Sequence, residues 1–72
     1  MLIYRTSEWK GEGKHNYYCE EYRFEDDCVV RYLCNRKKVL VGKEKMWDYT
    51  KEFVEKWSKT DENMPFWLNI YI

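Results

Sequence analysis

The sequence predicts an α+β fold, a small single domain spanning residues 1–72, in which one amphipathic helix packs on an antiparallel or mixed sheet of four to five strands. Residues 17–24 and 28–34 have a hydrophobic period of two, with apolar side chains recurring at every second position, as in half-buried strands. Residues 46–57 carry apolar side chains at helical spacing. A chain of 72 residues has room for one domain. The expected element order is β-β-β-β-α-β.

The core is expected to be aromatic. The chain has four Trp, seven Tyr and three Phe but no Ala or Gln, and each aromatic side chain can bury about 150–250 Å². Disordered chains are poor in aromatic residues and carry a net charge, whereas the net charge here is zero. We therefore expect a folded chain with Tyr22, Phe24, Phe53 and Trp57 in its core.

The first three strands are expected at about residues 2–9, 17–24 and 28–34. Gly11 and Gly13 mark the turn after the first strand. The second and third strands form a hairpin with an acidic tip of Glu25, Asp26 and Asp27.

The hairpin register is predicted from side-chain pairing. If Phe24 lies opposite Cys28, the apolar side chains of both strands share one face. On the other face Glu21 then meets Arg31. A slide by one residue pairs Cys19 with Cys34 but scatters the apolar side chains over both faces, so we favour the first register.

The second half of the chain is expected to contain the helix. A polar turn at 35–38 leads into a short strand at about 38–41, and Gly42 interrupts it. Met46, Tyr49, Phe53 and Trp57 share one side of a helix at about 48–60, with Asp48 as its N-cap. Residues 66–72 are apolar on both faces, which favours a strand inside the sheet.

The neutral net charge hides a division along the chain. A basic island of Arg31, Arg36, Lys37, Lys38, Lys43 and Lys45 follows an acidic group of Glu20, Glu21, Glu25, Asp26 and Asp27. Charges separated in this way either form a docking surface that steers a partner, a second copy included, or are solvated residues that keep edge strands from aggregating.

Residues with metal or catalytic chemistry do not form a recognisable motif. His15, Cys19, Cys28 and Cys34 have the spacing H-x3-C-x8-C-x5-C, without the CxxC pairs of structural zinc sites. A cysteine nucleophile with His15 as base lacks a marked orienting group. Since phosphate-binding glycine loops are also absent, we expect no metal, no cofactor and no enzymatic activity.

The chain is expected to be intracellular and not to bind a membrane. It has no stretch of roughly 20 apolar residues and no basic start followed by an apolar segment. Three cysteines, an odd number, fit a reducing compartment.

The leading functional hypothesis is a non-enzymatic protein-binding domain that acts as a small inhibitor or adaptor. By base rate, small domains without motifs are often phage or mobile-element proteins that block a host protein inside the infected cell. The alternative is an RNA or single-stranded DNA binding protein that uses the basic island, residues 31–45, although the nearby acidic residues oppose phosphates. The predicted partner-binding residues are Trp9, Glu25, Asp26, Asp27, Arg36, Lys37, Lys38, Lys43, Lys45, Trp67 and Tyr71.

Overall fold

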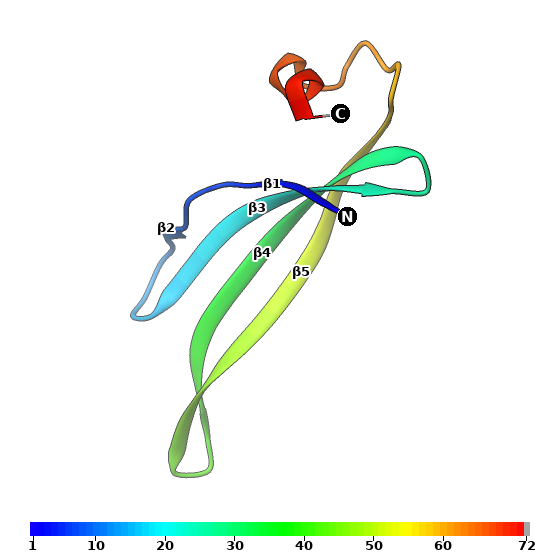
Figure 1. Ribbon diagram of the computed structural model, residues 1–72. Coiled ribbons are helices and arrows are strands. Elements are labelled where there is room, and N and C mark those ends of the chain that lie inside the picture. Colours follow the sequence, from blue (N-terminus) through cyan, green and yellow to red (C-terminus); the bar gives the residue numbers. More distant parts are fainter. Residues whose placement is uncertain (72) are drawn as a thin grey trace.

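Antiparallel strands make up most of the computed structural model, which describes residues 1–71 (Figure 1). The elements are β1 (Leu2–Arg5), β2 (Trp9–Lys10), β3 (Asn16–Glu25), β4 (Cys28–Val41), β5 (Glu44–Ser58) and a 3-10 helix η1 (Phe66–Tyr71). The sheet order is β1-β3-β4-β5, and β2 pairs with the other half of β3. No helix in residues 1–71 reaches seven residues, so the predicted α+β class with a packed helix is wrong.

The segment predicted as the helix 48–60 is most of strand β5. Its aromatic and β-branched residues favour a strand, and Gly42-Lys43 forms a two-residue loop that returns the chain along β4. Gly42 has φ 63°, as the glycine of a type II′ hairpin turn does. A bulge at Val54 changes the phase of the alternation, because Arg31 pairs with Glu55 while Tyr32 pairs with Phe53. The four residues predicted to form one helical stripe therefore lie on both faces of the strand, Met46 and Trp57 on one and Tyr49 and Phe53 on the other.

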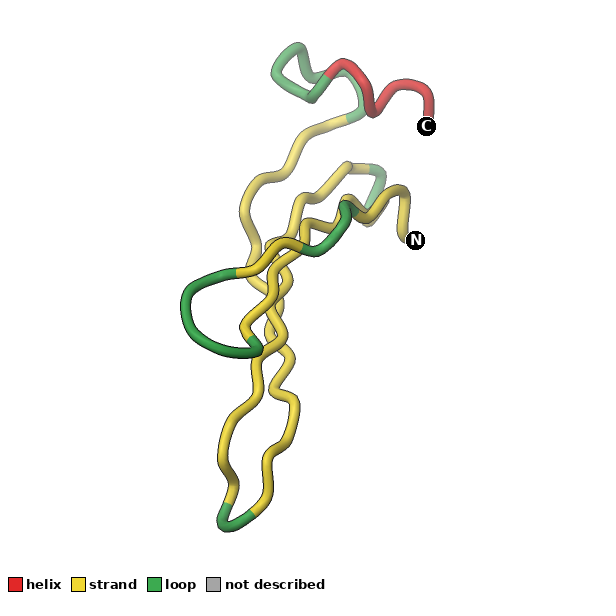
Figure 2. Tube along the Cα trace, turned by 90° about the vertical axis from the view of Figure 1, so that its left-hand side faces the viewer, coloured by secondary structure: helices red, strands yellow, loops and turns green. Residues whose placement is uncertain are grey.

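The turn predicted at residues 35–38 does not exist, because β4 runs without a break from Cys28 to Val41. Beyond Lys37, which pairs with Asn16 at the start of β3, only β4 and β5 continue. We call residues 38–47 the arm. In Figures 1 and 2 the arm projects away from both termini, and the chain measures 50 × 21 × 16 Å.

The hairpin of β3 and β4 is present, but its predicted register is wrong by one residue. Cys19 pairs with Cys34, and Glu25 pairs with Cys28 across a loop of only Asp26 and Asp27. Both aspartates have positive φ, 49° and 61°, as the centre of a type I′ turn requires, and Asp tolerates this conformation. The turn therefore sets the register. Arg31 consequently donates to Glu20 instead of Glu21.

The predicted first strand 2–9 is interrupted. β1 ends at Arg5, and β2 begins at Trp9. Between them Thr6 keeps contact with β3, since its N–H donates to the Glu20 carbonyl and its hydroxyl accepts from the Glu20 N–H.

The C-terminal segment predicted as strand 66–72 forms the 3-10 helix η1 over residues 66–71, and residue 72 lies outside the described residues. Met64, Trp67, Leu68 and Tyr71 follow the i, i+3, i+4, i+7 spacing of an amphipathic helix. Leu68 is fully buried. Its N–H donates to the Pro65 carbonyl.

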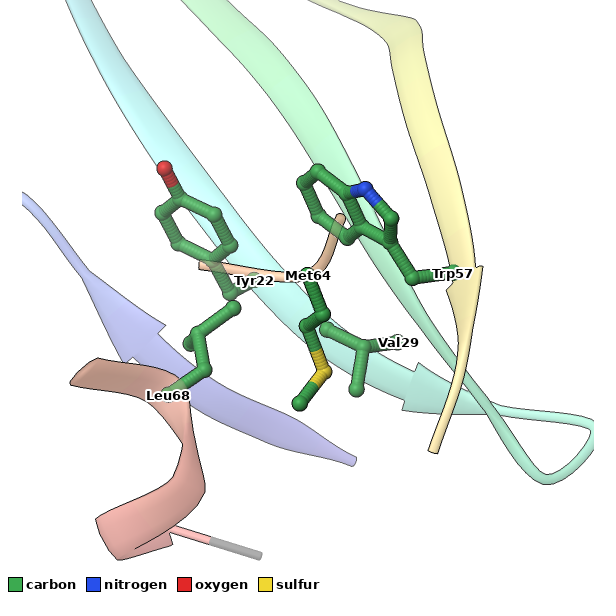
Figure 3. Close-up of a cluster of buried hydrophobic side chains, with 5 residues drawn as sticks. All are labelled: Tyr22, Val29, Trp57, Met64 and Leu68. Carbon is green, nitrogen blue, oxygen red and sulfur yellow. The ribbon is translucent and has the colours of Figure 1, made fainter. Parts of the chain in front are cut away.

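The core lies between the sheet and this C-terminal segment, which we call the cap (residues 61–71). It contains Tyr22, Val29, Trp57, Met64 and Leu68 (Figure 3). Tyr22 and Trp57 are core residues as predicted, Phe24 packs at the edge, and Phe53 is 62% exposed, against the prediction. The bulge explains Phe53, because it places Phe53 and Trp57 on opposite faces of the sheet.

Candidate functional site

The sheet has one face under the cap and one that no element within residues 1–71 covers. The register places Tyr22, Val29 and Trp57 on the first, which we call the capped face. Cys19, Cys34 and the residues that alternate with the core lie on the second, which we call the open face.

Basic side chains concentrate on the open face. The register places on it Arg5, Lys10, Arg23, Arg36, Lys38, Lys45, Lys51 and Lys56. The acidic side chains of β5 point the other way: the capped face carries Glu20, Glu44, Asp48, Glu52 and Glu55, with only Arg31 and Lys37 of opposite sign on the strands. The chain is neutral overall, but its two faces have opposite charge.

Glu21, one of the few acidic residues on the open face, is held by arginines. Arg5 Nη2 lies 2.5 Å from Glu21 Oε1, and Arg23 Nη1 lies 3.5 Å from Oε2. Burial raises the pKa of Glu21, but the hydrogen bond and the charge of Arg5 outweigh it, so the pKa lies below its ordinary value. Glu21 therefore stays ionised and cancels part of the arginine charge.

The other acidic side chains near this face are also engaged. Glu8, from the loop between β1 and β2, accepts two hydrogen bonds from Arg36, at 2.6 Å from Nε and 3.0 Å from Nη2. This hydrogen bond lowers the pKa of Glu8. The Tyr32 hydroxyl donates to Glu25 at 2.7 Å. In contrast, Lys10, Lys38, Lys45, Lys51 and Lys56 make no ion pair with any residue among 1–71.

Cations and aromatic rings alternate across the open face. The Arg36 guanidinium lies 4.4 Å from the ring centroid of Trp47 and 4.6 Å from that of Tyr17. Lys38 lies 5.4 Å from the Trp47 ring, and Lys51 lies 4.7 Å from the Tyr32 ring. Such contacts hold the rings and the long basic side chains in defined positions.

A groove of about 520 Å³ crosses the open face beside this stack. Its lining includes Cys19 and Cys34, with Tyr49 and Lys51 beside them and the ion pairs Arg5–Glu21 and Arg36–Glu8 around them. Burial raises the pKa of the Cys34 thiol to about 11, helped by Glu21 and Cys19, so the thiol is neutral. Tyr49 is 70% exposed, and it presents an aromatic ring beside the free ammonium group of Lys51. The groove can thus offer one positive charge without an ion pair, that of Lys51, and an aromatic surface to the same ligand.

The structure divides the residues predicted to bind a partner among several places. Arg36, Lys38 and Lys45 lie on the open face, Lys37 lies on the capped face opposite Asp48, and Lys43 lies in the turn of the arm. The acidic tip of Glu25, Asp26 and Asp27 is at the opposite end of β4 from that turn.

The three predicted aromatic anchors contact other rings. Trp9 stacks on Tyr18 with a centroid distance of 6.0 Å. Trp67 packs its edge on Tyr22 at 4.9 Å, and Tyr71 lies 5.6 Å from Tyr4. All three keep 41% to 45% of their surface exposed.

Sequence reasoning missed the part of the open face that β5 supplies. Lys51, Lys56 and Tyr49 were assigned to a helix, so their shared face with Arg36 was not visible. The signal that could have found them is a period of two: every second residue from 45 to 53 is basic or aromatic, namely Lys45, Trp47, Tyr49, Lys51 and Phe53.

The four residues of the hypothetical metal set are not brought together. Cys19 and Cys34 are opposite each other, whereas Cys28 is at the other end of the hairpin and His15 lies against Trp47. No group of three or more His, Cys, Asp or Glu within residues 1–71 has the arrangement of a metal site.

Comparison with known proteins found no match among family models, curated proteins or solved structures. No helix within residues 1–71 is long and apolar enough to cross a membrane.

Proposed function

We propose that the protein binds single-stranded nucleic acid on the open face of its sheet. One observation carries the proposal: the fold puts eight basic side chains and five aromatic ones on the same uncovered face, while the acidic side chains of β5 lie on the other. The five aromatic residues are Tyr17, Tyr32, Trp47, Tyr49 and Phe53. Single-strand binders combine positive charge for the backbone with rings on which bases stack.

The exposed rings are suited to stacking, and the free lysines to phosphates. Tyr49 and Phe53 are 70% and 62% exposed and flank Lys51 along β5. Arg36 fixes Trp47 and Tyr17 beside them. A duplex hides its base faces, so this arrangement favours an unpaired strand.

The acidic residues near the basic island lie away from the open face or are paired with arginines. The acidic residues near the basic island were expected to repel phosphates. Glu20 instead lies on the capped face beside Arg31, Glu21 is neutralised by Arg5, and Asp26 and Asp27 form a distant turn. The potential above the open face is therefore set mainly by lysines without ion pairs.

The test exploits two pairs of lysines that differ in position but change the charge equally. Lys38→Glu with Lys51→Glu alters the open face, and Lys37→Glu with Lys43→Glu alters the capped face and the turn. Binding of a labelled single-stranded oligonucleotide is measured by fluorescence anisotropy over a range of salt concentrations. Affinity of the wild-type protein should fall with salt, because each phosphate contact contributes about −0.7 to the slope of log K against log salt.

We expect the open-face pair to lower affinity at least about tenfold more than the control pair. Tyr49→Ala with Phe53→Ala should weaken binding by about 1–3 kcal/mol per stacked base at unchanged salt slope, while Phe66→Ala, on the cap, should not. The proposal is wrong if the wild-type protein does not bind at low salt, or if both lysine pairs weaken binding equally.

A protein-binding domain, an inhibitor or adaptor, is the second candidate. It is favoured by two apolar side chains exposed on the cap, Phe66 at 87% and Ile70 at 79%. Large exposed apolar groups of this kind are common anchors at protein interfaces. Pull-down from the native cells with the wild-type chain and with Phe66→Ser plus Ile70→Ser tests this: a stoichiometric partner retained by both, or by neither, contradicts a binding site on the cap.

A further inference from the structure

The free edge of β5 has a defined set of backbone groups that point outward. On β3, the even-numbered residues bond towards β1 and β2, as Glu20 does with Thr6 and Asn16 with Gly11. The direction of these groups alternates along a strand, so the odd residues of β3 bond towards β4, where they pair with even residues. The odd residues of β4 therefore bond towards β5. It follows that Lys45, Trp47, Tyr49, Lys51 and Phe53 of β5 turn their N–H and C=O groups away from the sheet.

This outward segment, residues 45–53, has structural limits on both sides. The Gly42-Lys43 turn precedes it, and the bulge at Val54 follows it. Between these limits the edge is regular, and Tyr49 is its midpoint. An unpaired strand edge of this length is a template for pairing with another strand.

Charge and the number of paired residues together select one register for pairing with a second copy. A two-fold axis perpendicular to the sheet pairs residues of the same face. The numbers of two paired residues must therefore add up to an even number, so the axis passes through a residue. Centring the axis on Asp48 sets Asp48 against itself and Lys45 against Lys51, and centring it on Lys51 sets two lysines together. Centring it on Thr50 sets Asp48 against Glu52. Centring it on Trp47 or on Tyr49 places no like charges opposite each other, but the Trp47 register pairs only residues 45–49, whereas the Tyr49 register pairs all of residues 45–53.

We propose that the chain forms a homodimer in which β5 pairs antiparallel with β5 of a second copy, Tyr49 lying opposite Tyr49. In this register Lys51 lies opposite Trp47 of the second copy, and Lys45 lies opposite Phe53. All these residues have outward N–H and C=O groups, so each pair can exchange two hydrogen bonds. The pairing stops where the bulge begins.

Dimerisation would add strands to the arm, which is the part of the sheet with the fewest strands. The arm is a two-stranded ribbon, and ribbons of two strands are marginally stable in water. A second copy adds strands to it. Because the axis is perpendicular to the sheet, the two open faces lie on the same side and form one continuous face. The proposal stands independently of the proposed function, since it rests on backbone direction and register.

Sedimentation equilibrium tests the dimer directly. The wild-type protein should have a molar mass of twice 9.1 kDa. The mass of a single chain at all concentrations up to about 1 mM overturns the proposal, because a dimer that dissociates at that concentration has little free energy of association. Tyr49→Pro removes an outward N–H that makes no bond to β4 and should yield a folded monomer. Lys56→Pro removes an outward N–H beyond the bulge and should leave the dimer intact.

Disulfide crosslinking tests the register and does not depend on proline being tolerated. Tyr49→Cys should crosslink to itself on mild oxidation, because directly opposed residues of a hydrogen-bonded pair lie about 5.5 Å apart. Trp47→Cys and Lys51→Cys should each fail alone and succeed when mixed, and the wild-type chain is the control for its native cysteines. Self-crosslinking of Lys51→Cys as fast as that of Tyr49→Cys overturns this register.

Discussion

The two ends of the long strands β4 and β5 are stabilised in different ways. At the capped end, Val29 and Trp57 lie side by side under Met64 and Leu68 and are almost completely buried. In the arm, the same two strands carry Leu40 and Met46 with 70% and 52% exposure. The capped end is therefore held by burial of apolar surface, and the arm by backbone hydrogen bonds and cation–ring contacts. Burial is the larger contribution.

The largest predicted effect on the free energy of unfolding comes from replacing the tryptophan near one end of β5, compared with the same replacement near the other end. Trp57→Ala should lower the free energy of unfolding by about 3–5 kcal/mol, because it leaves a cavity in the core. Trp47→Ala removes the ring between Arg36 and Lys38 and should cost about 1 kcal/mol. Urea denaturation followed by circular dichroism measures both.

Trp57→Phe is a matched control for this comparison. Trp57 Nε1 is buried without a hydrogen-bond partner among the described residues, so replacing the indole by a phenyl ring removes an unsatisfied donor and part of the volume. Its cost should stay below that of Trp57→Ala by at least about 1 kcal/mol. Equal costs for Trp47→Ala and Trp57→Ala contradict the proposed difference between the two ends.

The cap provides the second prediction. Leu68→Ala should cost about 2–5 kcal/mol, since Leu68 is fully buried between η1 and the sheet. Ile70→Ala, two residues away on the same short helix but 79% exposed, should change stability by less than about 0.5 kcal/mol. Thermal unfolding of the two variants separates these outcomes. A loss of similar size in both means that η1 does not cover the core as described.

The sequence predicted the hairpin of β3 and β4 and the core residues Tyr22 and Trp57, but it did not predict the last two elements. Period alone could not identify β5 as a strand: Tyr49, Phe53 and Trp57 follow one another at intervals of four residues, which places them on one side of a helix and equally on one face of a regular strand. At the C-terminus two periods coexist, because residues 66–71 alternate while Met64, Trp67, Leu68 and Tyr71 follow the helical pattern. Packing on the core favoured the second.

The candidate site was predicted only in part, for the same reason. Arg36, Lys38 and Lys45 were recognised as a charged group from their closeness in sequence. That Lys37 faces away from Lys38 follows from β4 continuing through residues 35–38, which were predicted as a turn. Arg5 joins the face only through pairing of β1 with β3, which sequence patterns do not reveal.

The third prediction concerns the ion pair of Arg5 and Glu21, which lies on the open face between the two ends. Arg5→Met leaves the buried Glu21 carboxylate with only the longer contact to Arg23. We expect a loss of about 1–2 kcal/mol at neutral pH, because Arg5 is half exposed and solvent screens part of the interaction. Urea denaturation at several pH values measures it.

The pH dependence gives the sign of this contribution. The pKa of Glu21 is lower in the folded chain than the ordinary value of 4.5, so its stabilisation is present above that value and is lost as the pH falls through the folded pKa. The difference between wild-type and Arg5→Met should therefore be full at neutral pH and shrink in acid. A difference independent of pH assigns the loss to packing of the Arg5 side chain instead.

The smallest effects are expected at the two hairpin turns, one at each end. Asp27 has φ 61° in the turn of Asp26 and Asp27, a conformation that glycine adopts without strain. Asp27→Gly should raise the free energy of unfolding by about 0.5 kcal/mol, since the gain in the turn is partly offset by the greater freedom of glycine in the unfolded chain.

Gly42→Ala makes the opposite change in the turn of the arm. Gly42 has φ 63° and open space around it, so the cost is conformational, about 1 kcal/mol. The arm can open locally without disturbing the core, and the cost to global unfolding cannot exceed the free energy of that opening. We therefore expect little change in the urea midpoint but faster amide exchange at Met46, whose N–H bonds to β4. Faster exchange at Val29 as well means that the arm and the capped end unfold as one unit.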